Sequence, residues 1–571
     1  MGMVVGRAKT KAGNIEVIVA RSDKLARALK QRPLLAIIPD RDNWNDYSYR
    51  HFADLILFGA DGEETPFQLR LMFENEKNTF DFLSGQFGER GETFPLDTVE
   101  TRYCALLGEV TGYRDLVALL GFDDAIGGLR KLHDVVLANI EGEDQDILTL
   151  MTGDPFHLGM IRNAPRYTAY RRGGRFLRRT PVPTVNDAAS SFSIEARLPA
   201  YEQPIEVDLD FSPDEIFDDR CCVLIGRNGV GKTQLLHAMI EAIERQETET
   251  ADDVVAASFT LGSPAFSRVL VFSSVQSDPY PKAIPPWAGI DYEYFAVAAD
   301  VEPLGRSFIQ CVVDCLRDDS SSFGSDAMRS ERYQLLQAML EKLGFLDDLY
   351  LPIAEDSEDG FHDLHSIGDD LFVGFAQRFI ERDQNRLAAL IDLGRPAIIL
   401  SDDRTPRRLS SGELAMAQFV AQAVASVENG SLLLLDEPET HLHPNYISTF
   451  MDILQDLLDR TKSIAIIATH SAYVVREVPR QRVNVLSRDA DGLLTSDRPR
   501  MQTFGANIDE LSQFVFDDWA MPARYRRRLA EWGRAKVSEI GIEGVLGEYG
   551  DQLSPVTLTL IARAARGDEI A

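Results

Sequence analysis

The sequence predicts an α/β fold built on a parallel sheet, preceded by a separate α+β domain. Residues 222–225 and 432–435 are apolar at every position, which is typical of parallel strands that helices cover on both faces. Each run is followed by a polar loop and then by a segment with helical periodicity, the order expected of βα units. Residues 1–185 contain neither pattern, so we expect them to form a domain of their own.

The first domain is expected to mix strands and helices. Asp61-Gly62 stands between two apolar runs, and this pair supports the positive φ angles of a tight hairpin turn. Apolar residues recur at helical spacing over 114–139, and Gly127-Gly128 is expected to interrupt the helix there. The strands expected in this domain are 15–20, 34–38, 55–58 and 67–71.

The remaining chain is expected to form two further regions, because 571 residues exceed what one hydrophobic core serves. We place the parallel-sheet domain at 190–490 and a mostly helical region at 491–571. Alternating apolar residues over 192–211 predict two strands that lead into the sheet. Residues 246–408 contain no sustained heptad repeat, so no long coiled-coil arm is expected.

Composition bounds the class of protein. The formal charge is −31, a field that repels nucleic acid as a whole. No run approaches the roughly 20 apolar residues that span a bilayer, and the N-terminus lacks a hydrophobic signal core. The five cysteines form no disulfide framework, and Cys311 and Cys315 are expected to be core thiols. These features favour a cytoplasmic protein without a membrane segment.

A phosphate-binding loop follows the strand at 222–225. The run Gly226-Arg227-Asn228-Gly229-Val230-Gly231-Lys232-Thr233 matches the P-loop pattern and precedes a helix. Its glycines let backbone N–H groups point at phosphates, and the helix N-terminus adds its positive end. We expect Lys232 to reach the β- and γ-phosphates of ATP and Thr233 to bind Mg²⁺. The expected nucleotide-binding residues here are Asn228, Gly229, Val230, Gly231, Lys232, Thr233 and Gln234.

Two acids follow the strand at 432–435. Asp436 ends the strand and is expected to hold the Mg²⁺ shell. Glu437 comes next and is positioned to polarise the attacking water as general base. The alternative, that Glu437 is only a charge at a helix entry, is disfavoured by the Asp-Glu-Pro run after four leucines.

Three further sites complete the predicted ATP site. Ser410, Ser411, Gly412 and Glu413 precede a helix, where small residues allow close approach to a γ-phosphate. In isolation this segment reads as an N-cap. His470 follows an apolar strand and is expected to sense the γ-phosphate; a lone histidine there is more often structural. Gln276 is a weaker candidate for a Mg²⁺ contact.

Two basic segments stand out in the acidic chain. Residues 160–180 contain seven arginines with interleaved aromatic residues and no acid, a composition that suits phosphates and stacked bases. The alternative, which we favour, is that this segment docks on acidic surface of the same chain. The second segment contains Arg524, Arg526, Arg527, Arg528, Arg534 and Lys536.

Two histidine pairs are open to another interpretation. His441 and His443 are two residues apart, and His362 and His365 are three apart. Neither pair has a cysteine or carboxylate pattern of zinc spacing nearby, so solvated or interface histidines are favoured over metal ligands.

Taken in this order, the four motifs resemble the SMC-like, soluble ABC ATPases of bacterial anti-phage systems. The string Asp436-Glu437-Pro438-Glu439-Thr440-His441-Leu442-His443-Pro444 is the most specific part, and the resemblance covers about 190–510. This family includes the ATPases of Septu-type and retron-linked systems and the OLD-family nucleases. It implies an ABC-type P-loop ATPase domain with a helical subdomain, and a homodimer in which the signature at 410–413 of one chain closes the P-loop of the other. Unlike OLD-family nucleases, the chain has no clustered carboxylates after His470 for a TOPRIM domain.

The function implied by the resemblance is an ATP-hydrolysing sensor or regulator of a defence system. It would act with a separate effector, expected to be a nuclease. A DNA-repair ATPase of the same fold that clamps DNA is the alternative, and a neighbouring nuclease gene would favour the first over the second. A third class, a module in which ATP is only structural, is disfavoured by Glu437.

Overall fold

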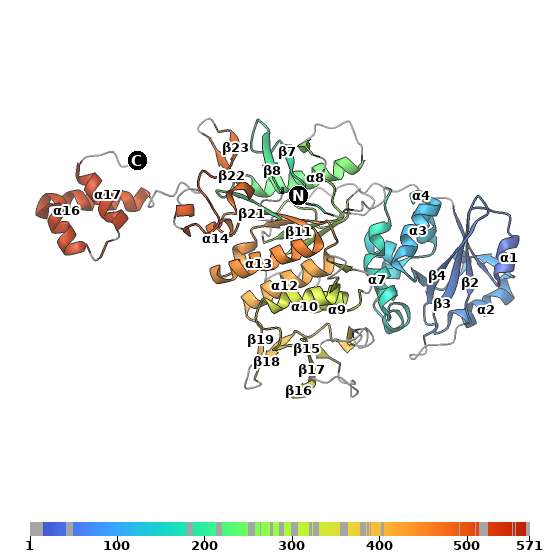
Figure 1. Ribbon diagram of the computed structural model, residues 1–571. Helices are drawn as coiled ribbons and strands as arrows, with labels where there is room; N and C mark the ends of the chain where they lie inside the picture. The colour runs from blue at the N-terminus through green and yellow to red at the C-terminus, as the bar shows by residue number, and fades with distance from the viewer. Residues whose placement is uncertain are drawn as a thin grey trace.

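The computed structural model places three groups of elements in a row, with the N-terminal domain and the C-terminal helices on opposite sides of a central body (Figure 1). The structure describes residues 15–41, 49–179, 185, 187–212, 220–248, 257–262, 264–274, 278–284, 290–297, 307–318, 322–323, 330–354, 364–376, 384, 387–388, 390–400, 405–489, 492–508, 510–512, 523–550, 552–553 and 555–566.

A six-stranded sheet organises the N-terminal domain, in the order β5-β1-β2-β3-β4-β6. β1 and β2 pair in parallel across α1, and the other neighbours are antiparallel. The hairpin predicted at Asp61-Gly62 is confirmed, with Phe58 opposite Glu64 and Gly62 at φ +87°. The elements are β1 Glu16–Ala20, α1 Asp23–Ala28, β2 Leu34–Pro39, β3 Phe52–Phe58, β4 Glu64–Phe73, α2 Thr79–Arg90, β5 Thr93–Pro95 and β6 Tyr103–Leu107.

Helices cover one face of this sheet, and one prediction about them is wrong. Gly127 and Gly128 do not interrupt a helix, since both are buried inside α4. A Cβ on Gly128 would lie 2.7 Å from Leu35 Cδ1, so close packing of helix on strand explains the glycine. The predicted stretch breaks instead at Gly121, at φ +76°, and again at His133, at φ +52°. These helices are α3 Val110–Leu120, α4 Phe122–Lys131, α5 Val135–Glu141, α6 Gln145–Leu150 and α7 Ala164–Arg172, which the 3₁₀ turn η3 Gly173–Phe176 follows.

The central body contains the predicted parallel sheet, in the order β12-β11-β20-β21-β9-β22-β23. The strands pair in parallel except for β23, which is antiparallel to β22. The four central strands β11, β20, β21 and β9 are buried at every position. The strands are β9 Cys221–Gly226, β11 Val269–Ser273, β12 Tyr292–Ala296, β20 Leu432–Asp436, β21 Ile464–Thr469, β22 Val483–Arg488 and β23 Leu494–Asp497.

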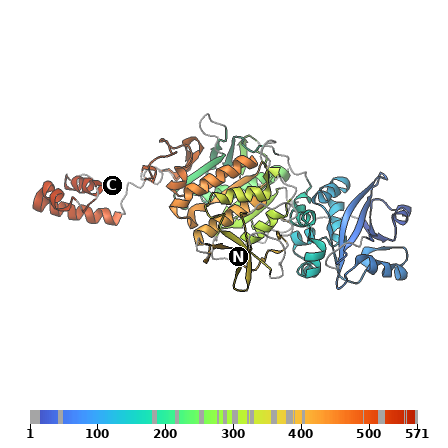
Figure 2. The same cartoon turned by 60° about the horizontal axis from the view of Figure 1, so that its bottom comes forward.

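The two faces of this sheet pack against different layers. Leu433 and Leu435 pack into the core shared with a helical layer, which Figure 2 shows in front of the strands. Leu432 and Leu434 join the core on the other face, which includes α8 Lys232–Thr248. Both faces are therefore dry, as a parallel sheet requires. The helical layer consists of α9 Phe308–Leu316, α10 Arg332–Glu341, α12 Ser411–Ser426 and α13 Pro444–Thr461.

The strands predicted at 192–211 form, but they belong to a separate sheet. β7 Phe192–Ala196 and β8 Ile205–Leu209 pair with β10 Ala257–Leu261 and cover the α8 face of the main sheet. The alternation of apolar and polar residues in these strands is thus that of an antiparallel sheet with one buried face, unlike the parallel sheet, which is buried on both faces.

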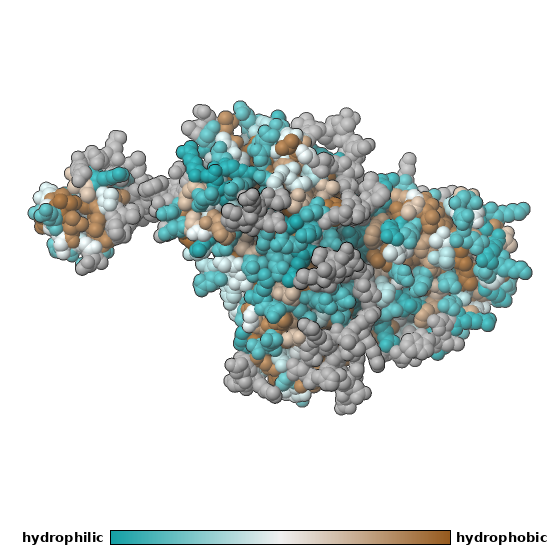
Figure 3. Space-filling model, viewed as in Figure 1, coloured by the Kyte–Doolittle hydropathy of each residue, from teal (hydrophilic) through white to brown (hydrophobic). Residues whose placement is uncertain are grey.

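Two further groups complete the described chain. A five-stranded antiparallel sheet lies between α10 and α12 in sequence and below the helical layer in Figure 1. The C-terminal helices α16 and α17 pack on each other, and Ile542 and Leu546 of α16 are exposed. Figure 3 shows apolar surface on this part of the molecule. The remaining elements are β13 Ser322–Phe323, β14 Ser330–Glu331, β15 Leu349–Ile353, β16 Leu364–Ile367, β17 Asp370–Gly374, β18 Ile398–Leu400, β19 Pro406–Arg408, α14 Ala472–Val475, α16 Ala523–Tyr549 and α17 Pro555–Arg566.

Cys311 and Cys315 lie buried on α9, as expected of core thiols, and Cys104, Cys221 and Cys222 are buried as well. Among the residues with a described position, no helix is both long enough and apolar enough to cross a membrane.

Candidate active site

Three of the loops singled out in the sequence, those that follow β9, β20 and β21, meet at one edge of the central sheet. Because β9, β20 and β21 run parallel, their carboxyl ends lie together, the edge at which open α/β sheets bind ligands. The register puts Asp436 opposite Ala468 and Thr469 opposite Ile225. Segments far apart in the chain therefore share one site.

The loop between β9 and α8 has the backbone of a phosphate cradle. Gly229 and Gly231 adopt φ angles of +79° and +111°, which residues with side chains rarely adopt. A Cβ on Gly231 would lie 2.9 Å from Leu198 Cδ1, so the loop is also tightly packed. The first N–H groups of α8, which begins at Lys232, have no helical partner and lie next to this loop.

Lys232 is buried at the centre of the site. Its Nζ donates to the Gly226 carbonyl at 2.9 Å and lies 3.4 Å from Glu437 Oε1. An ammonium held between the loop and an acid is placed to meet phosphate oxygens bound in the same loop. The other expected nucleotide-binding residues differ in exposure. Asn228 and Gly229 are exposed, Val230 is buried, and Gly231, Thr233 and Gln234 are half-buried.

Asp436 is the candidate Mg²⁺ ligand. It is fully buried at the end of β20, and the Tyr280 hydroxyl donates to its Oδ2 at 2.9 Å. Burial raises the pKa of Asp436 to about 6, against the opposing effect of hydrogen bonds from Thr233 and Tyr280. The Oδ1 atom is buried without a hydrogen-bond partner. A free carboxylate oxygen near the Thr233 hydroxyl is the donor set that Mg²⁺ prefers, so these residues fit the ion.

Glu437 has a strained backbone. It adopts φ +53° and ψ +47°, a left-handed conformation that is uncommon for a residue with a side chain. Its N–H donates to the Ala468 carbonyl at 2.8 Å, which ties the turn to β21. The conformation turns the side chain so that its carboxylate contacts His470 Nδ1 and lies near Lys232.

Glu439 is a residue of the site that the sequence analysis did not single out. It is 9% exposed, and its Oε1 accepts from the Thr469 hydroxyl and from the His470 N–H at 3.2 Å. Burial raises the pKa of Glu439, opposed chiefly by the Thr469 hydrogen bond. Glu439 thereby holds the loop that presents His470. Its position two residues after Glu437 in the turn η5 Pro438–His441 was the available signal.

Tyr280 is the second residue that the sequence analysis missed. It lies 156 residues from Asp436 in the chain and is buried. No local pattern marks a tyrosine in this loop as a partner of an acid on another strand. Gln276, the predicted Mg²⁺ contact near this position, lies outside the described residues.

The signature segment forms the start of α12. Ser410 is the N-cap and makes a capping box with Glu413, whose Oε2 accepts from the Ser410 N–H at 2.8 Å. Arg407 donates two hydrogen bonds to the Glu413 carboxylate and, as the largest cause, lowers its pKa to about 2. Ser410 and Ser411 are exposed, and Gly412 is half-buried. A well-capped helix N-terminus with exposed hydroxyls is thus presented at the surface.

The histidines outside this site have other surroundings where they are described. His443 caps α13 by accepting from the Asn445 N–H at 3.3 Å. His365 makes an edge contact with Tyr350. His362 and the side chain of His441 lie outside the described residues.

The first basic segment contacts acids of the same chain. Arg171 pairs with Asp314 at 3.2 Å, and Arg179 pairs with Asp123 at 2.8 Å. Arg172 and Arg175 pair with acids of the central body. These contacts favour docking over nucleic-acid binding for this segment. In the second segment Arg527 and Arg528 are exposed, whereas the side chains of Arg524 and Arg526 are outside the described residues.

Parts of the chain are similar to known proteins. Residues 321–476 match a family described as "AAA domain, putative AbiEii toxin, Type IV TA system". The chain is 27% identical to Protein ea59 of Escherichia phage lambda over 542 residues, which cover 90% of this chain and 91% of the phage protein. It is 26% identical to the fructose import ATP-binding protein FruK of Bifidobacterium longum, covering 32% of this chain and 36% of that protein.

The chain also matches a solved structure, the SMC head domain from Thermotoga maritima. It covers 55% of this chain and 100% of its own, at 11% identity and a TM-score of 0.27. Because this similarity is low, the fold is assigned from the sheet order and the loop positions of the chain itself. The central body has the fold of an ABC-type P-loop ATPase domain with a helical subdomain. An α+β domain precedes it, as the sequence predicted.

Proposed function

We propose that two copies of this chain bind MgATP in shared sites and hydrolyse it. The observation that carries the proposal is the meeting of Lys232, Asp436, Glu437 and His470 at one sheet edge. Lys232 binds phosphate oxygens, Asp436 and Thr233 hold Mg²⁺, and Glu437 accepts a proton from the attacking water. His470, which contacts Glu437, orients that carboxylate and meets the γ-phosphate. The bound ion would neutralise charge on the phosphates during transfer.

The dimer is proposed because the signature segment and a residue beside His470 are exposed. Ser410 and Ser411 are exposed on α12, and Leu414, in the same turn, is 46% exposed. Tyr473, three residues after His470, is 38% exposed. Apolar side chains beside both halves of the site support burial against a second copy.

The biological role proposed is regulation of a defence system through a separate effector, expected to be a nuclease. Two similarities support this setting. The matching family description names a toxin, and the alignment with the phage protein covers nine-tenths of both chains. The second candidate is a DNA-clamping repair ATPase, which the exposed Arg527 and Arg528 favour. Two results together would favour the repair ATPase: stimulation of ATP turnover by DNA, and no effect of the protein on phage plating.

Two matched variants test the ATPase. Lys232→Ala removes the phosphate ligand and is expected to abolish nucleotide binding. Glu437→Gln keeps the shape of the site and is expected to retain ATP while turnover falls by about 10²-fold or more, the usual contribution of a general base. Fluorescent-nucleotide binding and phosphate release measure the two effects. Normal turnover by Glu437→Gln would refute the assignment of the general base.

A further inference from the structure

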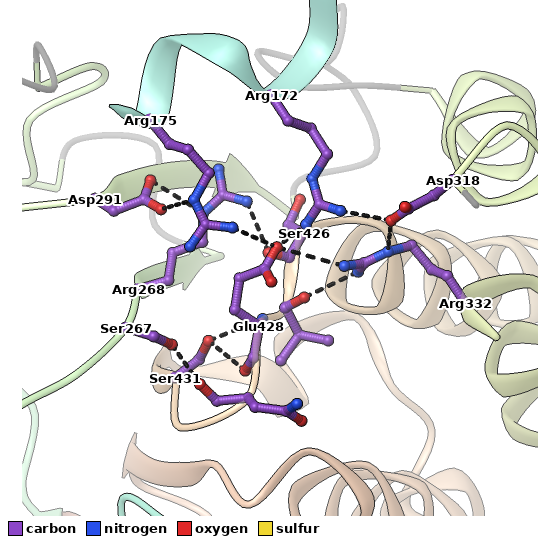
Figure 4. Close-up of polar contacts among 12 residues, drawn as sticks. Arg172, Arg175, Ser267, Arg268, Asp291, Asp318, Arg332, Ser426, Glu428 and Ser431 are labelled. Carbon is purple, nitrogen blue, oxygen red and sulfur yellow. Dashed lines mark hydrogen bonds and ion pairs between the residues drawn. The ribbon is translucent and has the colours of Figure 1, made fainter. Parts of the chain in front are cut away.

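The end of the N-terminal domain is tied to the ATPase domain by buried ion pairs (Figure 4). Arg172 at the end of α7 pairs with Asp318 at 2.5 Å and also with Glu428. Arg175 in η3 pairs with Glu428 at 2.9 Å and with Asp291 at 3.3 Å. The side chains of both arginines are less than 15% exposed, at 12% and 14%. Ion pairs this dry are screened little by salt and hold a defined geometry.

The same acids serve two arginines of the ATPase domain. Arg332 contacts Asp318 at 2.5 Å and Glu428 at 3.4 Å. Arg268 contacts Asp291 at 3.4 Å. Glu428 therefore stands among three arginines, two of which, Arg172 and Arg175, come from the N-terminal domain. Without its charge, these three guanidinium groups would face one another at short range.

Glu428 also marks the end of the signature helix. α12 begins at Ser411 and ends at Ser426, and its last carbonyls have no helical partner. Arg332 donates to the Val427 carbonyl at 2.9 Å and also to that of Val424. Arg268 donates to the Ser426 carbonyl at 2.7 Å. The arginines that hold this end of α12 are thus the ones that share acids with Arg172 and Arg175.

The turn after α12 leads directly to the hydrolytic residues. Ser431 Oγ accepts from the Glu428 N–H at 3.0 Å and donates to its carbonyl at 2.8 Å. Ser463, just before β21, also donates to the Glu428 carbonyl at 3.2 Å. β20 starts at Leu432 and ends at Asp436. Glu428 therefore connects the helix that begins at Ser410–Gly412 with the strands β20 and β21. Asp436 ends β20, and His470 follows β21.

We propose that Glu428 is a positioning residue through which the docked N-terminal domain sets the placement of the signature helix α12, and so the rate of ATP turnover. The proposal rests on the ATPase activity and shared sites proposed above. A helix moves as a rigid rod, so a shift at its Glu428 end is transmitted to Ser410 and Ser411 at the other end. A ligand or partner that changes the docking of the N-terminal domain would then change the closure of the ATP site.

The first test separates nucleotide binding from turnover. Arg175→Gln and Glu428→Gln remove one side each of the same ion pair, far from the P-loop. Both are expected to lower kcat at least fivefold with nucleotide Kd within twofold of wild type, and the double variant is expected to add nothing further. The control is Arg102→Gln, which breaks a two-acid ion pair, with Glu74 and Asp146, wholly inside the N-terminal domain. A kcat equal to that of Arg102→Gln in both variants would overturn the proposal.

The second test uses the wild-type chain and needs no turnover. Addition of a non-hydrolysable Mg-ATP analogue should slow amide hydrogen exchange at 164–177 as well as at 411–431. Protection confined to the P-loop segment 226–245 would overturn the proposal, even if the variants fail to fold. A wild-type chain that binds the analogue but hydrolyses no ATP would refute the proposed function, while the exchange at 164–177 would still decide this inference.

Discussion

The carboxylate of Glu437 meets Nδ1 of His470 across the ends of two neighbouring strands. The two residues are 33 positions apart, and Glu439 lies within reach of both, with Oε1 3.4 Å from the same ring nitrogen. The strained turn at Glu437 and the hydrogen bonds that Glu439 accepts from the 469–470 loop create this contact. Two residues with proposed chemical roles are thus positioned by a third, Glu439, to which the sequence analysis gave no role of its own.

Glu439 should act on turnover through His470. Glu439→Ala is expected to lower kcat about as much as His470→Ala, and the double variant about as much as either single one, because residues that act as a unit are not additive. Glu439→Gln keeps an oxygen that accepts from Thr469 and His470, so it should retain most of the activity. Steady-state kinetics of the four proteins measure this. Additive losses in the double variant would show that Glu439 acts independently of His470.

The Tyr280 hydroxyl should tune the affinity for Mg²⁺. Tyr280→Phe removes the hydrogen bond to Asp436 Oδ2, an interaction with a typical net contribution of about 0.5–1.5 kcal/mol. We expect the Mg²⁺ concentration for half-maximal ATP turnover to rise by up to about tenfold. Tyr292→Phe is the control, since its hydroxyl donates to the Pro281 carbonyl instead. Equal Mg²⁺ dependence in the two variants would argue against a role of Tyr280 in holding the ligand.

Mixed dimers should regain activity if the ATP sites are shared. Lys232→Ala disables the P-loop, and Ser411→Arg places a bulky side chain in the signature. A dimer with one chain of each kind has one intact site, because each undamaged half faces the other. Mixing the two inactive proteins should therefore restore up to about half of the turnover per mixed dimer. Mixed dimers that form, as shown by two affinity tags, but remain inactive would contradict a shared site.

The N-terminal domain should lose stability in acid because of His51. This ring is 0% exposed, both its nitrogens lack a hydrogen-bond partner, and burial lowers its pKa to about 4. The unfolded chain binds the proton more tightly, with a pKa near 6.5, so the contribution to stability is complete above that pH and is lost as pH falls toward 4. The loss is up to about 3 kcal/mol in the free energy of unfolding.

His51→Leu isolates this effect from the other titrating groups of the domain. The variant should show a smaller decrease in the free energy of unfolding between pH 7.5 and 4.5 than wild type, whatever its stability at pH 7.5. Urea unfolding at several pH values, followed by a probe in the N-terminal domain, provides the comparison. Parallel pH profiles for the two proteins would mean that His51 takes up no proton on unfolding.

Local chemistry alone made the ATPase elements predictable. The P-loop glycines, the buried leucines before Asp436 and the cap at Ser410 each depend on residues a few positions apart, so their spacing in the sequence already specifies the strand, loop or helix start. Because parallel strands share one carboxyl edge, the meeting of the P-loop with Asp436 also followed from the sequence, whereas the cap at Ser410 lies at the start of a helix.

The tertiary structure alone decided the contacts between distant segments. Tyr280 reaches Asp436, and Arg172 and Arg175 reach Glu428, only because the sheet and the α7–η3 segment pack as they do. The same holds for Gly128, whose missing side chain admits Leu35 of a strand rather than ending a helix. The sequence determined which residues carry charge or lack a side chain, whereas the packing of segments remote in the chain determined which charges are buried together, since burial and pairing depend on three-dimensional neighbours.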